Sequence, residues 1–264
     1  MILRAVRRWR RRRLLARHAI ADADWQAAVH AEACLRTLTQ AERVRLRELA
    51  TLFVAGKSFF GAAGFEVGPV HAARIAAVAA LPVLELGIDW YSGWHSIIVY
   101  PSGFLARHQQ PDPAGIVHDT QRALIGEAWD IGPVVFSWSD IEAGGRGDGY
   151  NVVLHELAHK LDMLDGASNG IPPLHPEMVR PQWTTAFSDC FDDIRGRIAA
   201  GRRTPVDAYA AEAPAECFAV VTEAFFECPQ TVAEAYPAVY AQLAAFYRQD
   251  PLRRHSMRRG DHNG

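Results

Sequence analysis

The sequence predicts a predominantly helical α+β fold that contains one small sheet. Most of the chain places apolar residues at helical intervals, and two short runs rich in β-branched and aromatic residues interrupt this pattern. Of the 264 residues, 49% are hydrophobic and 22% are charged. This is the balance of a globular protein with a substantial core.

Composition excludes several classes of protein. A net charge of −2 gives no general reason to expect nucleic acid binding by the folded core. The four cysteines are far apart and form no CxxC pair, so a cysteine-based zinc site and a dense disulfide framework are both disfavoured. The longest apolar run, 75–84, is too short to cross a bilayer, and we find no export signal. We therefore expect a cytoplasmic protein.

The first twenty residues form a basic arm with no acidic residue. Ile2, Val6 and Trp9 stand at helical spacing within it. We expect residues 1–20 to be a solvated, disordered arm, because blocks of like charge repel one another. Contact with a membrane surface or with nucleic acid is the alternative. The arginines of the arm are Arg4, Arg7, Arg8, Arg10, Arg11, Arg12, Arg13 and Arg17.

A helical region is predicted over residues 21–85. One helix begins after the Thr39 cap and carries apolar residues at helical intervals, and a second covers 71–80 before Pro82. The segments 94–104 and 132–141 are the two predicted strands. Apolar residues of the first helix are Val44, Leu46, Leu49, Leu52 and Phe53.

Residues 86–254 form the predicted catalytic region. A glycine-rich loop leads to Asn151, which is a good N-cap for the helix that follows. Further helices are predicted near 183–199, from Pro214 to the stop at Pro229, and over 232–248. Residues 255–264 complete the chain as a polar tail.

The segment NVVLHELAHKLDMLDG (151–166) contains the motif HExxH. Residues four apart share one face of a helix, so His155 and His159 can direct their imidazoles at one zinc ion. Glu156 would then reach toward a water that the metal polarises and act as its general base. The alternative is an ordinary pair of solvated or core histidines.

An apolar stripe on the same helix favours the metal site. Its members are separate from the histidines and can face the core. Asp162 and Asp165 are candidates to accept a hydrogen bond from a ligating imidazole. The stripe consists of Val153, Leu157, Leu161 and Leu164.

The third ligand has several candidates. The continuation expected of a metzincin is absent, since Asp162 and Asp165 occupy its positions. Glu177 stands near a suitable distance but in a proline-rich loop. Glu216 lies in the first turn of the Pro214 helix, where an inward carboxylate would be costly without a metal. Glu223, seven residues later, is an alternative ligand or a partner to one.

Tyr209 precedes Glu216 by seven residues in DAYAAEAPAE. Its hydroxyl could donate to a developing oxyanion, although an ordinary packed loop tyrosine is at least as good an interpretation.

Four segments together resemble the Mlc titration factor A family of bacterial zinc peptidases. They are HELAHKLDMLDG, DAYAAEAPAECFAV, LPVLELGIDW and GPVVFSW, and the resemblance extends over residues 25–254. It implies a zincin-like fold of the gluzincin type, akin to the catalytic domain of anthrax lethal factor, with a small sheet beside the HExxH helix. It also implies aminopeptidase-type activity on peptides and binding of the glucose-phosphotransferase repressor Mlc.

Carried over by position, the family's functional residues fall on the candidates already named. The resemblance implies that His155, His159 and Glu216 hold one Zn²⁺, that Glu156 is the general base and that Tyr209 is the catalytic tyrosine. We further expect GPVVFSW to form an edge strand that pairs with an extended substrate. The alternative function is a regulator-sequestering protein whose zinc site is structural or secondary.

Overall fold

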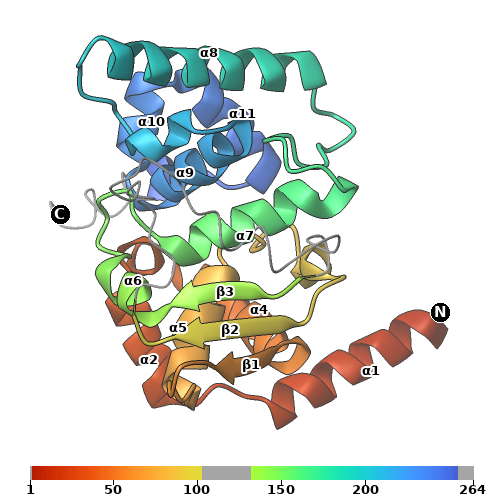
Figure 1. Cartoon of the computed structure of the whole chain (residues 1–264). Coiled ribbons are helices and arrows are strands. Elements are labelled where there is room, and N and C mark those ends of the chain that lie inside the picture. Colours follow the sequence, from red (N-terminus) through yellow and green to blue (C-terminus); the bar gives the residue numbers. More distant parts are fainter. Residues whose placement is uncertain (1, 103–131, 255–264) are drawn as a thin grey trace, which may run out of the picture.

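The computed structural model describes residues 2–102 and 132–254. It confirms a predominantly helical α+β fold (Figure 1). The described elements are, in chain order, α1 Ile2–Arg17, α2 Asp22–Ala31, α3 Ala33–Arg36, α4 Gln40–Gly56, β1 Ser58–Gly61, α5 Pro69–Ala79, η1 Ile88–Tyr91, β2 Ser96–Tyr100, β3 Val134–Ser137, α6 Trp138–Ala143, α7 Val152–Asp162, η2 Met163–Asp165, α8 Arg180–Ala199, η3 Ala208–Ala211, α9 Pro214–Glu227, α10 Pro229–Ala235 and α11 Pro237–Tyr247, where η marks a 3₁₀-helix.

Within residues 2–102 and 132–254, the sheet has three parallel strands in the order β1-β2-β3. Ile97 of β2 stands opposite Phe59 of β1 on one side and Val134 of β3 on the other. Ile97 and Val99 are fully buried, as expected for the central strand of a covered parallel sheet. β3 is one of the two edge strands of the described sheet and is the strand nearest α7 (Figure 1).

Helix α7 lies between the sheet and the group formed by α8, α9, α10 and α11 (Figure 1). Its side chains Leu154, Leu157 and Leu161 are fully buried. α9 packs against α7 and is buried from Ala215 to Glu227, with the exception of Glu216. Two buried helices therefore meet at this one partly exposed carboxylate.

Several element boundaries differ from the prediction. β1 falls within the stretch expected to be helical, because this short and mostly exposed strand is specified by pairing with β2 rather than by its own pattern. The second predicted strand ends at Ser137, whose side chain caps α6. Residues 138–141 are therefore helical. Residues 103–104 and the predicted tail 255–264 lie outside the described residues.

The apolar stripe of α7 is one residue shorter than predicted. Val153, Leu157 and Leu161 are buried, whereas Leu164 is 37% exposed. The reason is that α7 ends at Asp162, and the 3₁₀ geometry of η2 turns Leu164 away from the core-facing side. The C-terminal helical stretch is likewise divided, since Pro237 begins α11 after Tyr236.

Residues 2–17, which belong to the arm expected to be disordered, form α1. Arginine and leucine both favour helices, and Arg11 forms an ion pair of 3.1 Å with Glu48 of α4 that attaches the helix to the body. Within the described part of the chain, no helix has both the length and the apolar character needed to span a bilayer.

Candidate metal centre

Helix α7 presents both histidines of the motif from one face. Asn151 caps it, because its Oδ1 accepts a hydrogen bond of 3.3 Å from the backbone N–H of Leu154. His155 and His159 are one turn apart, and their ring centroids are separated by 4.8 Å. His155 is buried and His159 is half-buried, so the pair stands at the boundary of the core.

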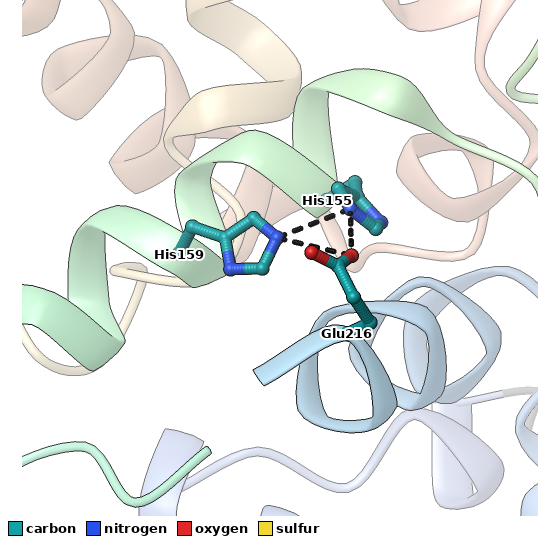
Figure 2. Close-up of side chains that lie close together, drawn as sticks. All are labelled: His155, His159 and Glu216. Carbon is teal, nitrogen blue, oxygen red and sulfur yellow. Dashed lines mark hydrogen bonds and ion pairs between the residues drawn. The ribbon is translucent and has the colours of Figure 1, made fainter. Parts of the chain in front are cut away.

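Glu216 reaches the same point from the first turn of α9 (Figure 2). Its Oε2 lies 3.0 Å from Nε2 of His155 and 3.3 Å from Nε2 of His159. The two Nε2 atoms are 3.2 Å apart. Three potential ligand atoms from two helices thus form a nearly equilateral triangle.

This triangle has the dimensions of one face of a zinc tetrahedron. Ligand atoms about 2.0–2.1 Å from a tetrahedral centre lie about 3.3 Å from one another. The observed separations of 3.0–3.3 Å match that value. Two imidazole nitrogens and one carboxylate oxygen are also donors that suit Zn²⁺ and leave a fourth position open. His155, His159 and Glu216 therefore fit a zinc ion in both geometry and chemistry.

The electrostatics of the metal-free centre reflect this crowding. Burial by itself lowers the pKa of His155, but hydrogen bonds to Glu216 and Glu223 raise it to about 9. Burial by itself raises the pKa of Glu216, but hydrogen bonds from His155 and His159 hold it well below its ordinary value. Without metal, a proton on His155 therefore compensates the buried carboxylates.

Glu223 fixes the orientation of His155. Its Oε1 lies 2.8 Å from Nδ1 of His155, and its Oε2 accepts a hydrogen bond of 2.6 Å from the backbone N–H of Asn151. A proton on Nδ1 is the assignment that satisfies this contact, so Nε2 is the nitrogen that can ligate a metal once it has lost its own proton. Of the two roles left open for Glu223, partner to a ligand is the one its position favours.

Asn151 also joins two further buried carboxylates that sequence reasoning missed. Its Nδ2 donates to Glu32 at 3.0 Å and to Glu227 at 3.1 Å. Arg74 donates to the other oxygen of Glu32 at 2.7 Å, and the backbone N–H of Gly147 donates to the other oxygen of Glu227 at 2.7 Å. Every oxygen of the two carboxylates therefore has a donor.

One sequence signal could have revealed Glu227. Glu216, Glu223 and Glu227 stand at intervals of seven and four residues, so they share one face of α9. No such spacing in the sequence marks Glu32.

Cys34 lies close enough to Glu32 and Glu227 for the three to resemble a second metal site. Because Arg74, Asn151 and Gly147 already occupy the oxygens, this cluster is a hydrogen-bonded network.

Tyr209 and Glu156 complete the centre. Tyr209 belongs to η3, and its ring centroid is 6.1 Å from that of His155. Asp207 holds the start of η3 by accepting a hydrogen bond of 2.9 Å from the backbone N–H of Tyr209. Glu156 is half-buried, and its charge adds to the forces that raise the pKa of His155. All five predicted residues are thus gathered in one place.

Glu177 is not in the centre. It is exposed and forms an ion pair of 2.8 Å with Arg248 on the surface. As an alternative third ligand it is excluded by position, because the proline-rich loop carries it away from α7.

The two aspartates expected to accept from an imidazole do not do so. Asp162 accepts from the backbone N–H of Gly170 at 2.8 Å, and burial raises its pKa to about 6. Its second oxygen and Nδ1 of His159 are both buried without a hydrogen-bond partner among the described residues. Asp165 is exposed and accepts from the backbone N–H of Ala167. The acceptor for His155 comes from α9 instead, because the end of α7 turns both aspartates elsewhere.

Comparison with known proteins places this centre in a family. The family model described as glucose-regulated metallo-peptidase M90 matches residues 6–248. The chain belongs to the M90 family. All five residues of the centre lie within the match, so a metal ion is expected for an M90 protein with this donor set.

Individual relatives agree with the M90 assignment. The chain is 40% identical over 235 residues to Mlc titration factor A of Yersinia pestis strain Pestoides F, covering 88% of this chain and 86% of the relative. The same figures hold for Mlc titration factor A of Yersinia pseudotuberculosis serotype O:1b strain IP 31758 and serotype O:3 strain YPIII. The family resemblance inferred from four sequence segments is confirmed.

Proposed function

We propose that this M90 protein is a cytoplasmic zinc-dependent peptidase of the gluzincin type, with aminopeptidase-type activity. The observation that carries the proposal is the triangle of ligand atoms at 3.0–3.3 Å, with Glu156 following His155 on the same helix. The aminopeptidase assignment rests on the family resemblance alone. His155, His159 and Glu216 are the proposed ligands.

The side chains around the triangle have complementary roles. A zinc ion bound there supplies a Lewis acid, which acidifies water and polarises a carbonyl. Glu156 takes the proton from the attacking water and later delivers it to the leaving amine. Tyr209, beside His155, donates its hydroxyl proton as a hydrogen bond to the oxyanion. Glu223 keeps the proton on Nδ1 of His155 throughout the reaction.

β3 offers a way to hold the substrate. In the described part of the chain it pairs with β2 on one side and with no strand on the other. An extended peptide can add to such an edge through main-chain hydrogen bonds. We propose that the substrate lies along β3, with its scissile carbonyl directed toward α7.

Glu156→Gln tests the chemistry. The variant should bind zinc as wild type does and lose at least about a hundredfold in kcat, because Gln cannot accept the proton. Tyr209→Phe should reduce kcat with zinc content unchanged. Glu142→Gln, an exposed change on α6, is the matched control and should retain full activity. Retention of kcat by Glu156→Gln would overturn the proposal.

Comparing the rates of hydrolysis of peptides with a free and with an N-acetylated amino terminus separates aminopeptidase from endopeptidase action.

A second function is supported by the relatives, whose name is Mlc titration factor A at 40% identity. We propose that the chain also binds the transcriptional repressor Mlc. Purified Mlc should co-elute with wild type and with Glu156→Gln alike, since general-base chemistry is not needed for association. Absence of association with wild type would remove this function and leave the peptidase proposal intact.

A further inference from the structure

Among the α1 residues whose side chains the structure describes, those that contact the body lie on one side. Arg11 forms its ion pair with Glu48 of α4, and Leu15, one turn later on the same side, is half-buried. Figure 1 shows α1 extending beyond the outline of the remaining helices, with its N-terminal end farthest from the body. A helix attached in this way leaves most of its circumference to solvent.

The side of α1 opposite Arg11 carries an exposed aromatic side chain. Trp9 is two residues from Arg11 and therefore lies on nearly the opposite side of the helix, where it is 59% exposed. Positions 2, 6, 9, 13 and 16 recur at intervals of three and four residues and carry Ile, Val, Trp, Arg and Ala. A surface helix normally turns its apolar stripe toward the core. In α1 the described members of the stripe, which include Trp9, are exposed instead.

Exposed cationic side chains accompany Trp9 on α1. Arg12, Arg13 and Arg17 are exposed, and the guanidinium of Arg13 lies 5.4 Å from the centroid of the Trp9 ring. Of the four α1 arginines whose side chains the structure describes, only Arg11 has an acidic partner among the described residues. The first twenty residues contain no acid, although the whole chain has a net charge of −2. Positive charge is therefore concentrated on one projecting element.

We propose that α1 is a membrane-surface helix that binds bilayers containing anionic lipids. Trp9 enters the headgroup region, while the neighbouring arginines remain at its surface and contact lipid phosphates. Charge complementarity identifies an anionic partner, and the exposed Trp9 distinguishes a bilayer from nucleic acid. A nucleic acid would engage the arginines without needing an outward tryptophan. This inference is independent of the metal centre.

Flotation of the full-length protein with vesicles provides the test. Wild type should float with vesicles of phosphatidylcholine mixed with phosphatidylglycerol and should stay unbound with phosphatidylcholine alone. Trp9→Ala should weaken binding by roughly tenfold or more through loss of apolar burial, and Arg12→Gln/Arg13→Gln by a similar factor through loss of charge. Because these side chains are exposed, the variants should melt at the wild-type temperature.

Two control variants match these changes at a distance from α1. Arg202→Gln/Arg203→Gln removes the same amount of positive charge from exposed positions after α8. Val179→Ser removes an exposed apolar side chain before α8. Both control proteins should bind vesicles as wild type does. Equal losses in the controls would overturn the proposal, as would full vesicle binding by Trp9→Ala.

Salt-sensitive binding to duplex DNA without vesicle binding would assign the helix to nucleic acid. Dimerisation that Trp9→Ala abolishes, without vesicle binding, would assign the stripe to a second copy of the chain.

Discussion

His155 is held by Glu223 on the nitrogen that faces away from the metal triangle. Nδ1 of the ring lies 2.8 Å from Oε1 of Glu223, while Nε2 lies 3.0 Å from Oε2 of Glu216. Both carboxylates belong to α9, and the imidazole belongs to α7. One helix therefore supplies a proposed ligand and also orients another proposed ligand on its neighbour.

Glu223→Gln should reduce zinc affinity by about 10- to 100-fold, as changes to such supporting acceptors usually do. Gln cannot accept simultaneously from Nδ1–H of His155 and from the backbone N–H of Asn151, because its NH₂ group only donates. Chelator competition measures the affinity. Glu227→Gln is the matched buried control on α9 and should change it much less, and equal losses would show that any disturbance of α9 suffices.

Zinc binding should release about one proton at neutral pH. The pKa of His155 in the metal-free protein is about 9, so the ring is protonated there, whereas ligation requires a neutral Nε2. The apparent affinity should therefore rise about tenfold per pH unit as the pH increases toward 9. Calorimetry in buffers of different ionisation enthalpy counts the protons. Binding without proton release near neutrality would contradict the protonated state assigned to His155.

Asn151→Ala should lower the free energy of unfolding by about 2–4 kcal/mol. It removes the cap of α7 and leaves buried oxygens of Glu32 and Glu227 without their donor. Asn151→Asp keeps the capping oxygen but adds a carboxylate beside two others, so it should destabilise more. Urea unfolding measures both. Asn169→Ala in an exposed turn is the control, and a loss there as large as for Asn151→Ala would mean that the buried network contributes little.

Glu227 should make stability fall as pH rises. Burial raises its pKa from 4.5 to about 7, so the folded state binds a proton that the unfolded state has lost. The contribution is favourable below about pH 4.5 and declines through about pH 7, by roughly 3 kcal/mol in total. Glu227→Gln should remove this decline. Urea unfolding at about pH 5 and about pH 8 gives the difference, and an identical decline in both proteins would assign it to another group.

The sequence predicted the helices of the candidate centre better than the boundaries of the other elements. The motif helix, its Asn151 cap and the Pro214 helix were all placed correctly, because each depends on local periodicity or capping. β1 was missed because four residues with little burial carry almost no pattern of their own. Leu164 was placed in the core by extending a helical period past the end of α7.

By itself, the sequence determined that His155, Glu156 and His159 share one helical turn, because spacing along a single helix fixes which side chains face together. It left Glu177, Glu216 and Glu223 as rivals, since the separation of residues far apart in the chain depends on how helices pack. The tertiary structure decided among them by placing the start of α9 against α7, with Glu216 at the triangle and Glu223 behind His155. It also turned Trp9 outward, which a helical period alone cannot specify.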